Sequence, residues 1–130
     1  MDAYNSIISC GPRLRMALMT DGRLEAVGDR VFPVVSRSNE QLPFIAFART
    51  DTFEDSVKGA RGPMAAIYEF QIYSETWEEG LRIADAVADV LDGFRDDAIR
   101  ACRLMASNEE FFAPAKAYVQ SVSFKVKTNN

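Results

Sequence analysis

The chain has 130 residues, and 19 acidic against 15 basic residues give it a formal net charge of −4, with no histidine. With 48% hydrophobic and 26% charged residues it is typical of globular domains, and it lacks the basic surplus of a nucleic-acid reader. It also lacks the apolar run of about 20 residues that a membrane span needs and the basic and apolar start of a secretory signal. The length predicts one domain, 1–130, with residues 127–130 as a frayed tail.

The first half of the chain combines helix signals with short strand signals. Apolar residues in Asp2–Thr20 recur at helical spacing, and Gly11-Pro12 is expected to break that helix or to restart it with Pro12 in its first turn. The other elements expected up to residue 63 are a helical turn at Arg23–Val27, an edge strand at Arg30–Val35, a polar loop at Ser36–Gln41, a strand at Phe44–Thr50 and an exposed hairpin loop at Asp51–Pro63.

The second half of the chain holds the clearest strand and helix. Residues 66–73 alternate between an apolar and a mixed face, which is typical of an antiparallel sheet covered on one side. Thr76 is the expected N-cap of a helix, with Glu79 completing a capping box and Gly93 ending the helix. The remaining expected elements are a strand at Ala98–Ser107, a connecting loop at Asn108–Pro114 with two aromatic residues, and a strand at Ala117–Lys127.

This order of elements predicts an α+β fold, with a mainly antiparallel sheet of about four main strands and two helices packed on one face. Charge is unevenly distributed, because residues 69–97 carry a balance of −7 and residues 98–130 a balance of +3. A solvated helix face explains the acids without further help and is the favoured interpretation, and patches of opposite sign that guide self-association are the alternative. The sequence alone does not separate these two interpretations.

The residue types needed for common catalytic and metal sites are missing. Without histidine, Cys-His catalysis and His-containing zinc sites are excluded. Cys10 and Cys102 are expected to be free thiols, with Cys102 filling the core. The carboxylate pairs at residues 78–79, 96–97 and 109–110 are sequence neighbours that do not face each other, and Gly59–Pro63 has no phosphate-loop spacing. We therefore expect no catalytic residues, no metal and no cofactor.

The hairpin loop is the candidate contact element. It is either a segment that becomes ordered on assembly or a plain exposed hairpin, and its apolar side chains either dock on a neighbour or fold back on their own sheet. Trp77, at the start of the second helix, is expected to pack in the core or as a hydrophobic staple. The candidate contact residues are Asp51, Phe53, Glu54, Asp55, Val57, Lys58 and Arg61.

Several short strings, in their order and spacing, resemble one family of phage and prophage proteins. The chain is similar to the tail completion or tail terminator proteins of head–tail junction gene clusters, such as the tail terminator of phage lambda. The strings that carry the resemblance are Gly28–Pro33, Leu42–Phe47, Ala66–Ser74, Trp77–Ala84, Leu91–Gly93 and Tyr118–Gln120.

This resemblance implies a structural role in the virion. Such proteins have a fold related to tail-tube modules and form a ring, commonly a hexamer, at the head-proximal end of the tail. The ring ends tube growth and meets the head connector, while DNA passes through its lumen without specific binding. The implied partners are other copies of the chain, the tail tube protein and the head connector protein, with no membrane. The implied location is the tail or neck of the virion, and the host bacterial cytoplasm during assembly.

Two alternatives predict different properties. A small-molecule-binding or enzymatic α+β domain predicts a closed apolar pocket with a few convergent polar groups. A nucleic-acid binder predicts tight, salt-sensitive binding to duplex DNA.

Overall fold

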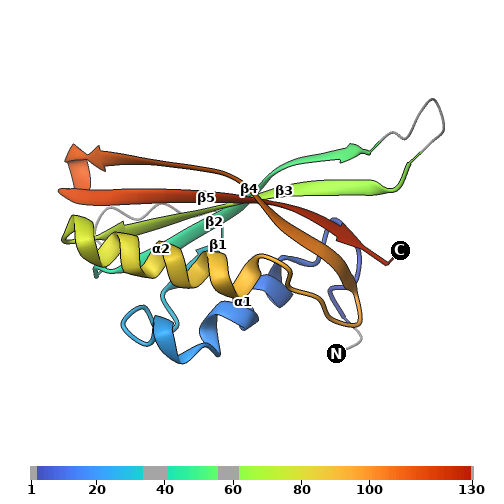
Figure 1. Cartoon of the computed structure of the whole chain (residues 1–130), viewed down its shortest axis with the longest axis horizontal. Coiled ribbons are helices and arrows are strands. Elements are labelled where there is room, and N and C mark those ends of the chain that lie inside the picture. Colours follow the sequence, from blue (N-terminus) through green and yellow to red (C-terminus); the bar gives the residue numbers. More distant parts are fainter. Residues whose placement is uncertain (1–2, 34–40, 56–61, 130) are drawn as a thin grey trace.

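A five-stranded sheet with two helices on one face forms the body of the protein (Figure 1). The computed structural model describes residues 3–33, 41–55 and 62–129. The elements in chain order are α1 (Gly11–Met19), the 3-10 helix η1 (Gly22–Leu24), β1 (Val31–Pro33), β2 (Phe44–Glu54), β3 (Met64–Ser74), α2 (Trp77–Leu91), β4 (Ile99–Phe112), the 3-10 helix η2 (Ala113–Ala115) and β5 (Ala117–Thr128). The predicted α+β fold is confirmed.

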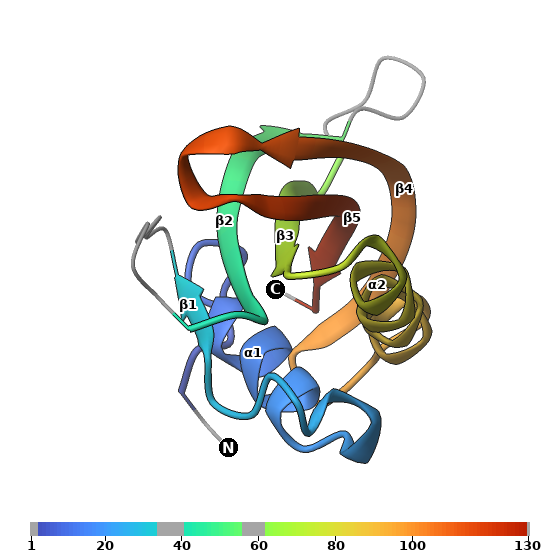
Figure 2. The ribbon, with the colours of Figure 1, turned by 90° about the vertical axis from the view of Figure 1, so that its left-hand side faces the viewer.

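The strand order across the sheet is β1-β2-β3-β5-β4. β1 pairs with β2 in parallel, and all other pairs are antiparallel, so the mainly antiparallel sheet is also confirmed. β1 lies at one edge, as its proline predicts, and β4 forms the other edge (Figure 2). Neither helix within the described residues is long and apolar enough to cross a membrane.

The main core lies between the sheet and the two helices. Phe70 is fully buried at its centre, with its ring stacked 5.2 Å from that of Phe47 and edge-on at 5.8 Å from that of Phe124. α2 supplies an apolar stripe from Ile83 to Leu91, with buried residues three to four positions apart. Because strand side chains alternate between faces, these core positions fix which side chains point away from the helices.

A second, smaller apolar cluster lies on the opposite face of the sheet, at one end. The rings of Phe44 and Tyr73 stack at 4.5 Å, and Phe112 meets Tyr73 edge-on at 6.3 Å. Ala117 and Val119 of β5 complete the buried part. The sequence prediction placed Phe112 in a loop, but this packing and its pairing with Ala117 make it the last residue of β4.

Of the two outcomes expected at Gly11-Pro12, the structure has the restart, because α1 begins at Gly11 with Pro12 in its first turn. The described residues before Gly11 are not helical, so the helical spacing from Asp2 was wrong for them. The segment before it folds back onto the buried guanidinium of Arg13. This group donates to the carbonyls of Tyr4 (2.8 Å) and Ala3 (2.9 Å) and pairs with the carboxylate of Asp97 at 2.6 Å. Backbone carbonyls used in this way are not available to a helix, which explains why the helical spacing was misleading.

Three strand boundaries also differ from the prediction. β2 continues to Glu54 and β4 to Phe112, because each has a paired neighbour along its whole length. Lys127 and Thr128 belong to β5, and Asn129 donates to the carbonyl oxygens of Ala98 and Asp97, so these residues do not fray. Residue 130 lies outside the described residues.

The start and end of α2 follow its predicted signals. The Thr76 hydroxyl accepts from the backbone N–H of Glu79 at 3.2 Å, and Gly93 follows the helix with φ +85°. Near its start the helix lies very close to β3, because a Cβ on Gly80 would be 2.6 Å from the Ser74 hydroxyl oxygen. That hydroxyl is held in place by donating to the Thr76 carbonyl at 2.8 Å.

We expect Gly80→Ala to destabilise the protein, although alanine is favoured over glycine inside a helix by about 1 kcal/mol. The added methyl group meets the Ser74 hydroxyl, which must leave its hydrogen bond or push the helix away from the sheet. Urea unfolding should be measured for Gly80→Ala, Ser74→Ala and the double variant Ser74→Ala/Gly80→Ala. The serine change should restore much of the unfolding free energy that Gly80→Ala loses. A Gly80→Ala protein as stable as wild type would contradict this close approach.

Candidate interaction surfaces

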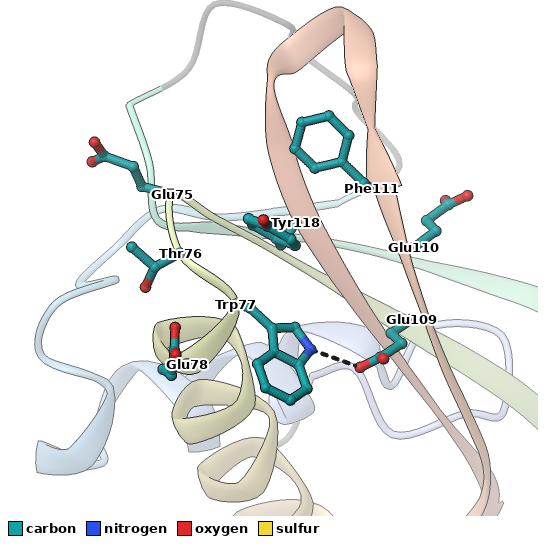
Figure 3. A pocket seen from close by; sticks show the side chains of 8 residues that line it. All are labelled: Glu75, Thr76, Trp77, Glu78, Glu109, Glu110, Phe111 and Tyr118. Carbon is teal, nitrogen blue, oxygen red and sulfur yellow. Dashed lines mark hydrogen bonds between the residues drawn. The ribbon is translucent and has the colours of Figure 1, made fainter.

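An acidic groove lies between the start of α2 and the end of the β4–β5 hairpin (Figure 3). It is an open surface groove of about 720 Å³. Its lining combines four carboxylates with three exposed aromatic rings, and the lining residues are Glu75, Thr76, Trp77, Glu78, Glu109, Glu110, Phe111 and Tyr118. Trp77 is 45% exposed, so the prediction that it packs in the core is wrong.

Glu109 is held in place at the edge of this acidic groove. Its Oε1 atom accepts from Gln120 Nε2 at 2.9 Å and from Trp77 Nε1 at 3.1 Å (Figure 3). These two hydrogen bonds lower the pKa of the Glu109 carboxyl, so the group is ionised at neutral pH. Both donors use the same oxygen, which leaves Oε2 to accept from a further donor.

The lining of the acidic groove favours a cationic side chain. No lysine or arginine is among its lining residues as the structure describes them, so the four carboxylates are not compensated locally. Aromatic faces attract cations and stack well with guanidinium groups. The groove is therefore unlike the closed apolar pocket that the small-molecule alternative predicts. Within the described ranges, no group of three or more Cys, Asp or Glu side chains is arranged to hold a metal ion.

The edge of β4 is the second exposed feature. Its residues 103–111 are all exposed, including Leu104 and Met105. The connection from α2 covers the outer edge only at the start, where Gly93 donates to the Cys102 carbonyl and Leu104 donates to the Asp92 carboxylate. From Met105 onward, β4 pairs with β5 alone among the described strands, and such an edge favours pairing with another chain.

The predicted contact loop is shorter than the sequence suggested. Asp51, Phe53 and Glu54 belong to β2, which ends one residue before Asp55. Val57, Lys58 and Arg61 lie outside the described residues. The loop prediction was wrong for residues 51–54. Their charges and the glycines that follow them are typical of a loop, but β2 stays paired with β3 as far as Glu54, which is in register with Met64.

Asp55 joins this hairpin to β5. Its Oδ2 atom lies 2.6 Å from Lys127 Nζ and 3.0 Å from Lys125 Nζ, and the latter ammonium lies 5.7 Å from the centre of the Phe53 ring. Hydrogen bonds from Lys127 and Lys125 lower the pKa of the Asp55 carboxyl. Of the predicted contact residues, the structure therefore brings together Phe53 and Asp55.

The Asp55 cluster should make stability depend on pH. Because the pKa of Asp55 is lower in the folded than in the unfolded chain, its contribution is present above about pH 4 and is lost as pH falls through the folded pKa. Urea unfolding should therefore show Asp55→Asn less stable than wild type at pH 7, with the difference in unfolding free energy narrowing as the pH falls below about 4. Asp85→Asn, an exposed position on α2, is the control. A constant gap between Asp55→Asn and wild type across this range would contradict the assignment.

Two residues that the sequence did not single out are Arg49 and Glu109. Glu109 is half of an adjacent acid pair in the sequence, and Arg49 lies in a predicted strand. The signal that identifies them is spatial, since each lies in a strand whose outer edge has no partner over part of its length among the described residues.

The buried cysteines match their predicted role. Cys10 and Cys102 are both free and fully buried. Burial raises the pKa of Cys102 to about 12 and also raises the pKa of Cys10, so both thiols are protonated at neutral pH.

Comparisons with known proteins establish the fold. No protein-family model and no curated protein sequence matches the chain. Among solved structures, it is similar to a chain from the virion of a native gene transfer agent (GTA) particle. The TM-score is 0.70 with 14% sequence identity, and the similarity covers 88% of this chain and 90% of that chain. The protein therefore shares its fold with a chain of a phage-like particle.

Proposed function

We propose that this chain is a structural subunit of a phage or phage-like virion that forms a ring at the head-proximal end of the tail. In this role it ends the tail tube and joins it to the head connector. The observation that carries the proposal is the shared fold over 90% of a chain from a gene transfer agent virion. The order of the sequence strings that resemble tail terminators supports the same assignment.

The sheet supplies the surfaces that a ring needs. A ring forms when one surface of each subunit meets a different surface of the next and the rotation closes. β4 leaves an outer edge at one side of the sheet. On the other side, β1 pairs only with Ile45–Phe47, so β2 has no outer partner among the described residues from Ala48 to Glu54. Two different edges are thus available for continuing the sheet into a neighbour.

The face opposite the helices suits a DNA passage. Residues in register across neighbouring strands form rows on this face. One row near the middle of the sheet holds Gln71, Ser121 and Asn108, and the next row holds Glu69 and Ser123. These two rows carry no lysine or arginine. Further along the same face lie Arg103, Lys125 and Lys127, and both lysines are paired with Asp55. Because phosphate contacts by basic residues dominate DNA affinity, the two middle rows are the part of this face that would let DNA pass without gripping it.

Tube assembly with the tail tube protein of the same gene cluster tests the proposed function. Electron microscopy should show that adding this chain caps tubes at one end and shortens their length distribution in proportion to its concentration. Bovine serum albumin at equal concentration is the control. Unchanged tube lengths with no ring at either end would overturn the proposal.

A further inference from the structure

We propose that the β4 edge of one copy pairs with the β2 edge of the next, in a single register that inserts Arg49 beside Glu109 in the acidic groove. This inference rests on the proposed ring, and it names the surfaces that meet. The occupant of the groove is a second copy of this chain.

Strand direction sets the first constraint. β2, β3, β5 and β4 are successive antiparallel neighbours, so β2 and β4 run in opposite directions within one subunit. Copies related by rotation about an axis along the strands keep these directions. The β4 edge of one copy therefore meets the β2 edge of the next as an antiparallel pair.

The side-chain faces set the second constraint. Arg49 is in register with the buried Tyr68, which packs under the helices, and Glu109 is in register with Gln120 and through it with the core residue Ile72. Arg49 and Glu109 therefore lie on the helix face. Arg103 is in register with Lys125, the residue that Asp55 binds on the opposite face.

Two matching irregularities allow these residues to align. β2 skips Thr50 in its register with β3, and β4 skips Arg100 and Met105 in its register with β5. Of the two skipped residues in β4, Met105 lies next to the open part of the edge and Arg100 lies before it. When Thr50 and Met105 are left out of the pairing, the side chains of both strands alternate between the helix face and the opposite face in the same order. The α2–β4 connection covers the outer edge up to Leu104, so the pairs between copies begin after it. They are Ala106 with Phe53, Ser107 with Thr52, Asn108 with Asp51 and Glu109 with Arg49.

This register places an apolar pair, Ala106 with Phe53, at one end of the contact and opposite charges, Glu109 with Arg49, at the other. Slipping by two residues is the smallest shift that keeps the faces matched. One such slip puts Glu109 opposite Thr52, and the other puts it opposite Phe47, where β1 already occupies the edge. Both slips lose the Glu109–Arg49 ion pair, so the charges select one register.

The acidic groove is prepared for the arriving guanidinium. Glu109 Oε1 is occupied by Trp77 and Gln120, and Oε2 remains as the acceptor. In the isolated chain Arg49 donates to the hydroxyl of Thr52 at the exposed surface. A carboxylate is a stronger partner than a hydroxyl for a guanidinium, so this contact gives way on assembly.

Charge reversal with complementation tests this register. Arg49→Glu alone places two carboxylates at each interface and Glu109→Arg alone places two cations, so each variant should self-associate at least about tenfold more weakly than wild type. In an equimolar mixture the two variants can alternate around the ring, so that every interface again joins one carboxylate to one guanidinium. The mixture should therefore assemble like wild type. Sedimentation velocity over a concentration series measures all three.

Two further variants keep the test independent of folding defects. Glu109→Gln retains an acceptor for Trp77 and Gln120 but removes the charge, so it should fold normally and associate more weakly. Asp85→Arg, the matched charge reversal on the exposed surface of α2, should associate like wild type. Thermal unfolding of each variant verifies that it is folded.

The outcomes separate the two proposals. If wild type assembles and the single reversals assemble equally well, or the mixture does not recover, this register is wrong while the ring stands. If wild type remains monomeric both alone and with the tube protein, the proposed function is wrong and the register with it.

Discussion

Phe70→Ala should lower the free energy of unfolding by about 3–5 kcal/mol, the range for removing a large aromatic side chain from a packed core. Phe70 is fully buried and its ring contacts those of Phe47 and Phe124, so its loss leaves a cavity between sheet and helices. Urea unfolding at neutral pH measures the change. A fall in Tm of about 10 °C or more should accompany it.

Phe111→Ala is the matched control for Phe70→Ala. Phe111 is 55% exposed, and among the described residues its ring meets that of Tyr118 edge-on at 5.1 Å. Its replacement should therefore cost no more than about 1.5 kcal/mol. Equal losses for the two variants would show that the core does not lie where the structure places it.

Met105→Lys should weaken the proposed self-association while leaving the fold intact. Met105 is 53% exposed at a skipped position of β4, and lysine on an edge strand is a typical barrier to pairing between chains. We expect self-association to weaken at least about tenfold, which corresponds to about 1.4 kcal/mol. Light scattering over a concentration series measures this effect.

Met16→Lys makes the same chemical change on α1, where Met16 is 47% exposed and takes no part in the sheet. This control should assemble like wild type. Assembly by Met105→Lys at wild-type concentrations would remove the β4 edge from the interface.

The elements with local signals were predictable from the sequence. The N-cap at Thr76, the stop at Gly93 and the alternation in residues 66–73 depend on neighbours in the chain, and each is found in the structure. The proline of β1 likewise indicated an edge strand. Such signals act over a few residues, so the sequence carries them without reference to the rest of the fold.

The wrong boundaries depend on distant partners. Asn108–Phe112 has the polar and aromatic composition of a loop, but β5 pairs with it throughout and turns it into strand. The first ten residues have helical spacing, yet the buried Arg13 takes their carbonyls. In both cases tertiary contacts outweigh local preference.

The interaction surfaces were still less accessible to sequence reasoning. Glu109 becomes distinctive only when Trp77 and Gln120, 32 and 11 residues away, fix its carboxylate. Arg49 becomes distinctive only because β1, as far as the chain is described, pairs with β2 no further than Phe47. A linear pattern does not record which strand edge remains unpaired, since that depends on the order of strands across the sheet.

The mass of the purified wild-type chain, alone and with the tube protein, tests the central claim most directly. Light scattering should give one discrete multiple of 14.5 kDa, stable against dilution and larger than a dimer, because edge pairing between different surfaces continues until the ring closes. A mass of 14.5 kDa at every concentration, unchanged by the tube protein, would contradict the account.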